Sequence, residues 1–167
     1  MSVLKVPLRA PDATAFAPYG DLVVPPDTPG CRQFYSATLH TRPTESSPVL
    51  HVNHILPQTL PIEVTGIERH PHAAQCFLPI DVARYVVMVM PSDDAGQPQT
   101  DRALAFLMPG TIGVIYNPGV WHLGATVLDR PGHFTVLMWR TGLQQDDQFL
   151  SIAPMIITDS ASSAPPE

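Results

Sequence analysis

The chain has few charged residues, few cysteines and no long apolar run. Of its 167 residues, 14% are charged, well below the roughly 25% of a typical soluble domain. The formal net charge is −6, so the chain lacks the basic footprint of a nucleic-acid-binding protein. No stretch approaches the ~18 apolar residues of a membrane span, and residues 1–12 contain no signal-peptide core. We therefore expect a cytoplasmic protein whose partners include neither a membrane nor a nucleic acid.

Several motifs of catalysis and metal binding are also missing. The chain has no Gly-rich phosphate loop, and G-x-S-x-G, C-x-x-C and H-E-x-x-H do not occur. The two cysteines, Cys31 and Cys76, are far apart in the sequence and match no metal-binding spacing. This usage favours two reduced thiols over a disulfide.

Proline, by contrast, is abundant, at 20 of 167 residues, well above the ~5% of average proteins. Many prolines and few charges predict many turns and short strands. Turn signals at intervals of ~8–12 residues indicate an all-β sandwich or barrel with little helix. Two similar strand-loop-strand halves favour a cupin-like double-stranded β-helix barrel, a fold that holds a small ligand in its mouth. We expect one such domain over residues 1–157 and a disordered polar tail over residues 158–167.

Alternation in residues 49–56 predicts which side chains of this strand point inward. Leu50, Val52 and Leu56 share one face, and we expect that face to pack against the core. His54 lies on the same face and should also point inward. Two other segments, 84–91 and 133–140, are continuously apolar and predict strands covered on both faces.

A second alternating segment, residues 61–70, places a carboxylate and an imidazole on its expected core face. The residues predicted to share that face are Ile62, Val64, Gly66, Glu68 and His70. Burying Glu68 and His70 is costly unless they bond to each other, to a ligand or to a metal. We therefore expect this pair to have a function.

The spacing His70-Pro71-His72 offers a metal-binding alternative. On a strand it places two imidazoles on one face, about 7 Å apart between Cα atoms. With His122 from a distant strand, they form a possible divalent-metal site of His70, His72 and His122.

Residues 115–124, I-Y-N-P-G-V-W-H-L-G, join a strand to a turn and then to Trp121-His122. We expect the turn to end a barrel strand at the mouth of the ligand pocket, with Trp121 as an apolar wall and His122 facing the ligand. A packing role for Trp121 and a plain turn at Asn117-Pro118-Gly119 are the alternatives. His40, His51 and His133 are expected to be satisfied core or surface residues with no ligand role, and Asp93-Asp94 and Asp146-Asp147 to be solvated loop charges.

Two longer motifs resemble those of a known family. They are I-E-R-H-P-x-x-x-Q-x-F-x-P at 67–79 and G-x-x-G-V-x-Y-x-x-G-V-W-H at 110–122. With A-F-A-P-Y-G-D at 15–21 and Arg140-Thr-Gly, they resemble the ureidoglycolate lyases over roughly residues 14–150. The resemblance implies a cupin-type barrel, a homodimer and cleavage of (S)-ureidoglycolate to glyoxylate and urea, the last step of allantoin breakdown in purine catabolism. That reaction requires no cofactor.

The resemblance also implies a set of site residues. The matching polar positions are Glu68, Arg69, His70, Gln75, Tyr116, Trp121 and His122. His122 is expected to be the general base or acid, with His70 as its partner and Glu68 orienting them.

Substrate binding would fall to residues around these three. Arg69 is expected to pair with the substrate carboxylate, although strand alternation points it away from Glu68 and His70. Gln75 and Asn117 would bind the urea moiety, and Tyr116 and Trp121 would complete the pocket.

The chain departs from the family pattern at four positions, Asn117, Leu123, Leu104 and Trp139. Two alternatives therefore stay open. One is a cupin that binds a small carboxylate or ureido ligand without turnover, and the other is a metal-dependent cupin enzyme.

Overall fold

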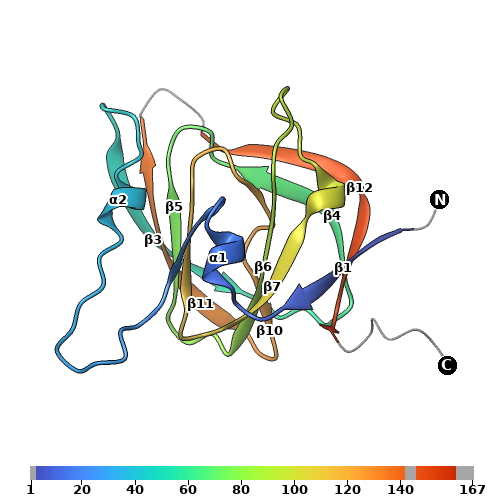
Figure 1. Cartoon of the computed structure of the whole chain (residues 1–167), viewed down its shortest axis with the longest axis horizontal. Coiled ribbons are helices and arrows are strands. Elements are labelled where there is room, and N and C mark those ends of the chain that lie inside the picture. Colours follow the sequence, from blue (N-terminus) through green and yellow to red (C-terminus); the bar gives the residue numbers. More distant parts are fainter. Residues whose placement is uncertain (1–2, 142–145, 161–167) are drawn as a thin grey trace.

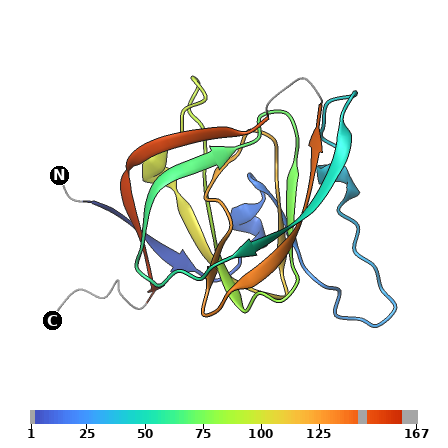
Figure 2. The same ribbon diagram turned by 180° about the vertical axis from the view of Figure 1, so that it is seen from behind.

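The computed structural model of the chain describes residues 3–141 and 146–160. It is an all-β, cupin-like barrel with little helix, as predicted (Figures 1 and 2). The helices are α1 (Ala13–Phe16), α2 (Ser36–Leu39) and the 3-10 turn η1 (Thr100–Arg102). The strands are β1 (Leu4–Arg9), β2 (Gly20–Val23), β3 (Ser47–Ile55), β4 (Ile62–Arg69), β5 (Gln75–Pro79), β6 (Arg84–Met90), β7 (Leu104–Pro109), β8 (Gly113–Tyr116), β9 (Trp121–His122), β10 (Thr126–Leu128), β11 (Gly132–Arg140) and β12 (Gln148–Thr158).

The strands form two sheets. One has the order β10-β6-β7-β1-β12-β4-β9, and β9 also pairs with β6, so this sheet closes on itself. The other has the order β2-β8-β5-β11-β3. In Figure 2, β12 and β4 run side by side, as do β3 and β11.

Strand β6 lies between two apolar cores. Tyr85, Val87 and Val89 pack toward the five-stranded sheet. The alternate residues Val86 and Met88 pack toward β1, β4 and β12. Side chains on both faces of this strand are therefore buried, and the prediction that residues 84–91 form a strand covered on both faces is confirmed.

Strand β11 is covered less completely than predicted. Its residues Phe134, Val136 and Met138 are buried, but the alternate ones are only partly so. On that outer face the Trp139 Nε1–H donates to the backbone carbonyl of Leu39 in α2, at 3.0 Å. The expectation of two buried faces is thus wrong for 133–140, because α2 shields only part of the outer face.

The predicted inward face of residues 49–56 is wrong. Leu50 is 68% and Val52 58% exposed, and His54 stacks on His133 at the surface with ring centroids 4.5 Å apart. β3 is the edge strand of the five-stranded sheet, and its other face, with His51 and Asn53, borders a cavity. Because that cavity is lined by polar groups, the polar face of β3 is the inner one.

The predicted common face of residues 61–70 is also wrong, since the alternation breaks at Gly66. Ile62 and Val64 are buried in the barrel core, Gly66 is exposed, and Ile67 is buried again. The pairing of β4 with β12 shifts register between Ser151 and Met155, opposite this point. Such an irregularity reverses the faces of the strand. Glu68 and His70 still share one side, which faces the cavity.

The short helix α1 is capped by Asp12. Asp12 Oδ1 accepts hydrogen bonds from the Thr14 and Ala15 backbone nitrogens at 2.9 and 3.0 Å. The cap directs Phe16 into the core, where it is fully buried.

Both cysteines are free, as predicted, and burial raises the pKa of the Cys76 thiol to about 11. Among the described residues, no helix has the length and apolar character needed to cross a membrane. The start of the predicted tail, Thr158, belongs to β12, and residues 161–167 lie outside the described residues.

Candidate functional site

A cavity of about 400 Å³ lies beside the end of β4. Apolar side chains, among them Phe77 and Met138, form part of its wall. The polar side chains that line it come from several strands: His51, Asn53, Glu68, His70, Gln75, Thr126, Arg140 and Asp147. This mixture suits a small polar ligand.

The Asn117-Pro118-Gly119 turn brings β9 against β4. Gly119 has a backbone φ of 79°, a conformation that favours glycine. Its N–H donates to the His70 carbonyl at 2.8 Å, which fastens the turn to the end of β4. As a result His122 pairs directly across from Glu68.

The His122 ring is held on three sides. Its Nδ1 donates to the Val120 carbonyl at 2.9 Å, since a carbonyl can only accept. The ring stacks on Tyr116, with centroids 4.0 Å apart. Nε2 lies 3.4 Å from Glu68 Oε1. His122 is only 1% exposed and is not among the residues that line the cavity, so it reaches the cavity through Glu68.

His70 is buried but lines the cavity. Its Nδ1 lies 3.2 Å from the Asp146 carbonyl oxygen and 3.1 Å from Asp147 Oδ1. Both neighbours are acceptors, so we assign the ring hydrogen to Nδ1. Nε2 then carries a lone pair, and it has no hydrogen-bond partner among the described residues.

The environment shifts the pKa of two groups that line the cavity, Glu68 and His70. For Glu68, burial opposes the charge, but the contact with His122 and the nearby His70 outweigh it and lower the pKa. For His70, burial and repulsion by His122 lower the pKa below 6.5, against the opposing effect of Glu68 and Asp147. A carboxylate and a neutral imidazole are therefore favoured side by side at neutral pH.

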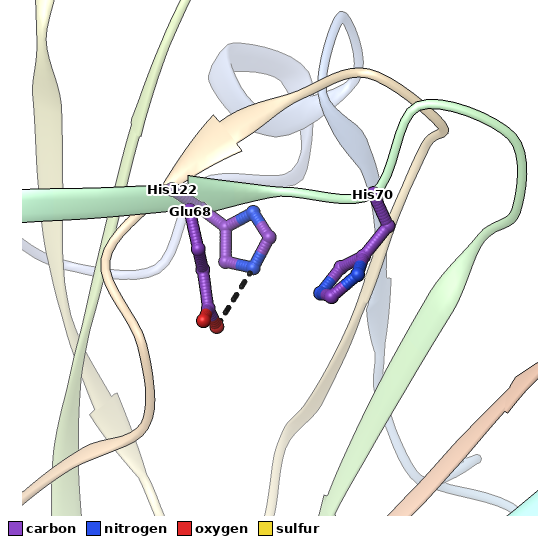
Figure 3. A group of neighbouring side chains, drawn as sticks. All are labelled: Glu68, His70 and His122. Carbon is purple, nitrogen blue, oxygen red and sulfur yellow. Dashed lines mark ion pairs between the residues drawn. The ribbon is translucent and has the colours of Figure 1, made fainter. Parts of the chain in front are cut away.

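Glu68, His70 and His122 form a cluster (Figure 3). One ligand atom from each lies within 4.8 Å of the others, and the Nε2 atoms of both histidines are buried without a hydrogen-bond partner among the described residues. Two imidazoles and one carboxylate make a donor set that fits a divalent metal. His72, predicted as a ligand, is exposed and outside this cluster, and Glu68 takes its place.

Of the predicted substrate-binding residues, only Gln75 lines the cavity. Its side-chain Oε1 is buried and has no partner among the described residues. Tyr116 lies behind His122, on which it stacks. Asn117 does not line the cavity, and its backbone N–H donates to the Tyr19 carbonyl.

Arg69 and Trp121 lie outside the cavity and hold a loop instead. The Arg69 guanidinium packs over the Trp121 ring at 4.4 Å. Arg69 Nη1 and Trp121 Nε1 both donate to the Gly96 carbonyl, at 2.8 and 3.0 Å. The predicted role of Arg69 in binding the substrate carboxylate is therefore not supported, because alternation does point it away from the cavity.

The expectation of solvated charges at Asp146-Asp147 is wrong. Asp146 is 4% exposed and accepts from the His72 backbone nitrogen. Asp147 accepts from Arg140 Nη2 with both oxygens, at 3.0 and 2.8 Å. His51, expected to have no ligand role, borders the cavity. Sequence reasoning missed these cavity residues. The alternation of His51 and Asn53 was the one pattern that could have indicated them, because it also fits a strand whose polar face is turned to a ligand.

Comparison with known proteins identifies the family. A family model described as ureidoglycolate lyase matches residues 3–157. This chain belongs to the ureidoglycolate lyase family. It is similar to a ureidoglycolate lyase of Burkholderia cepacia, 34% identical over 132 residues that cover 74% of this chain and 73% of the relative. A ureidoglycolate lyase of Pseudomonas aeruginosa is 28% identical over 161 residues, 89% of this chain and 92% of the relative.

The two segments that resemble ureidoglycolate lyase motifs are those that meet in the cluster. Residues 67–79 contribute Glu68 and His70, and residues 110–122 contribute His122. Gln75, in the first segment, lies beside them at the cavity.

Proposed function

We propose that this chain cleaves (S)-ureidoglycolate to glyoxylate and urea, as a carbon–nitrogen lyase of allantoin and purine catabolism. The observation that carries the proposal is the cavity in which the Glu68 carboxylate meets the unpartnered Nε2 of His70. Membership of the ureidoglycolate lyase family supports it.

The reaction requires two proton transfers and no redox step. One carbon of the substrate bears a hydroxyl, a carboxylate and a ureido nitrogen. The hydroxyl proton leaves, and its O–H electron pair forms the C=O bond of glyoxylate. The C–N pair goes to the ureido nitrogen, which takes a proton and departs as urea. The proton removed balances the proton added.

His70 is the residue that moves this proton. Its Nδ1 is held by acceptors, and its lowered pKa keeps the ring neutral near pH 7. Nε2 can therefore accept the hydroxyl proton and, as imidazolium, return it to the leaving nitrogen. His122, the expected base or acid, is buried behind Glu68 and supports the charge of that carboxylate.

Glu68 and Gln75 orient the substrate. The ionised Glu68 carboxylate accepts a hydrogen bond from the substrate hydroxyl or ureido N–H. Gln75 Oε1 offers a second buried acceptor, which matches the N–H groups of a ureido moiety. A buried acceptor with no partner among the described residues strengthens selection for a ligand that pairs it.

A divalent metal is a second candidate, favoured by the convergence of Glu68, His70 and His122. These residues would hold it, and it would supply Lewis-acid polarisation of a bound oxygen. Dialysis against EDTA followed by addition of single divalent ions separates the two cases. Restored turnover together with a raised melting temperature supports the metal, and full turnover after EDTA excludes it.

The assembly and location also belong to the proposal. We expect one cupin-like domain over residues 1–157 that forms a homodimer in the cytoplasm. The exposed apolar side chains Leu50, Val52 and Leu78, on the outer face of the five-stranded sheet, support the dimer.

The direct test is a product assay. Purified protein is mixed with (S)-ureidoglycolate, and urea and glyoxylate are measured against the spontaneous rate. We expect equal amounts of both products. Binding of ureidoglycolate without turnover, with or without added divalent ions, would instead identify a ligand-binding cupin.

A further inference from the structure

One cationic side chain lines the cavity among the described residues, and it is Arg140. It lies at the end of β11, and its side chain is 39% exposed. Arg69, the cation expected to bind a carboxylate, is committed to the Gly96 loop outside the cavity. An anionic group that enters the cavity therefore meets Arg140.

Arg140 is fixed by a neighbour but keeps free donors. Its Nη2 donates to both carboxylate oxygens of Asp147, at 3.0 and 2.8 Å. Its Nε and Nη1 have no partner in residues 3–141 and 146–160. A guanidinium held at Nη2 keeps N–H donors on Nε and on Nη1, and either one can make a charge-assisted hydrogen bond to an anion.

Asp147 also connects Arg140 with the proton-transfer site. Its Oδ1 lies 3.1 Å from His70 Nδ1 while it accepts from Arg140. Arg140 and His70 are therefore neighbours of one carboxylate. Because Arg140 and His70 both line the cavity and both contact Asp147, an anion held by Arg140 would lie near His70.

We propose that Arg140 binds the carboxylate of the substrate through an N–H of its Nη1 or Nε, and so favours turnover of ureido carbinols that carry a carboxylate. This inference rests on the proposed function and specifies its substrate class. Asp147 balances the charge of Arg140 in the free protein and holds its Nη2. Glu68 does not bind this part of the substrate, because its carboxylate repels the substrate carboxylate.

The test compares two substrates that differ only in the carboxylate. Hydroxymethylurea has the same carbinol and ureido groups as ureidoglycolate and lacks the acid. For Arg140→Gln we expect kcat/KM on ureidoglycolate to fall by about 10²-fold, mainly through KM, since a charge-assisted contact is lost. On hydroxymethylurea the same variant should stay within about threefold of the wild type.

Arg84→Gln is the matched control. Arg84 makes a similar pair with Asp129, at 2.6 and 2.8 Å, and does not line the cavity. It should leave both substrates unaffected. Equal losses for Arg140→Gln on the two substrates would overturn the proposal, because they would show damage to the cavity as a whole.

Binding of glyoxylate separates this inference from the proposed reaction. By calorimetry the wild type should bind glyoxylate, and Arg140→Gln should bind it at least about tenfold more weakly. If the wild type turns over neither substrate, the lyase proposal fails while this binding difference still supports Arg140. Equal glyoxylate affinities for the two proteins would reject it.

Discussion

The two histidines of the site share one arrangement at the residue scale. Each has its Nδ1 beside a backbone carbonyl, of Asp146 for His70 and of Val120 for His122. Each therefore turns Nε2 toward Glu68, where neither finds a hydrogen bond among the described residues. Buried polar atoms without partners cost stability, so this arrangement is the expected signature of a site that a ligand completes.

The lowered pKa of His70 makes stability depend on pH. Burial and repulsion by His122 lower that pKa below 6.5 in the folded chain. At a pH between the folded and the unfolded pKa of His70, the unfolded chain binds a proton that the folded chain does not bind. The contribution of His70 to stability is therefore fully present above about pH 6.5 and is lost as the pH falls through the folded pKa. Thermal melts of EDTA-treated protein from about pH 8 to about pH 5 should show this loss.

His70→Gln provides the comparison, since it removes the titrating group. Its melting temperature should fall less steeply over the same range than that of the wild type. Parallel curves for the two proteins would show that His70 is protonated equally in the folded and unfolded chains.

At the scale of elements, the faces of the strands were harder to predict than the strands themselves. β6 needed only its composition, because both of its faces are buried. For β3 the alternation fits two orientations, with either the apolar or the polar face turned inward. The assumption that the apolar face is buried fails here, because the inner side of β3 borders a polar cavity. In β4 the reversal at Gly66 depends on the register of β12. That pairing joins segments about 80 residues apart in the chain and leaves no local signal.

The site residues also differ in whether a local sequence pattern or tertiary packing reveals them. Glu68, His70 and Gln75 could be predicted because they lie in one motif of the sequence. Arg140 also lies in a matching segment, but its proximity to His70 and that of Asp147 could not be predicted, since they come from tertiary packing alone.

The turn before β9 has a testable backbone requirement. Gly119 has a φ of 79°, and a Cβ there would meet nothing within 4 Å. Gly119→Ala should therefore cost about 1–2 kcal/mol of stability through backbone strain alone. It should also lower kcat, because the turn positions His122 against Glu68. A thermal melt and a product assay measure the two effects.

Gly30→Ala is the control for this change. Gly30 has a φ of 84° and equally open surroundings, and it does not line the cavity. It should show a similar stability loss with an unchanged kcat. A fall in kcat for both variants would argue against a specific role of the Gly119 turn.

The contact of Arg69 with the Gly96 loop predicts a structural role. Arg69→Met removes the packing over Trp121 and the hydrogen bond to the Gly96 carbonyl. We expect a loss of about 1–2 kcal/mol in the free energy of unfolding, with KM unchanged. A raised KM at unchanged stability would instead return Arg69 to substrate binding.

At the scale of the whole molecule, the outer face of the five-stranded sheet is apolar and open. Leu50 and Val52 are more than half exposed on this face, and α2 covers only its other end. Large exposed apolar side chains on one face of a sheet are typical of an interface with another protein.

We expect this face to be buried in the interface of the homodimer. The double change Leu50→Ser, Val52→Ser should therefore raise the dimer dissociation constant by at least about tenfold, as measured by light scattering over a dilution series. Val3→Ser, at an exposed residue just before β1, should leave the dimer intact. A monomeric wild type at micromolar concentration would contradict the dimer.

The most direct test of the central claim is the rate of urea release from (S)-ureidoglycolate by His70→Gln. If Nε2 of His70 carries the proton, kcat should fall by roughly 10²–10⁴-fold while the protein stays folded. His54→Gln, a change on the outer face of β3, should retain the wild-type rate. A folded His70→Gln protein that releases urea at the wild-type rate would contradict the claim that this cavity performs the reaction through His70.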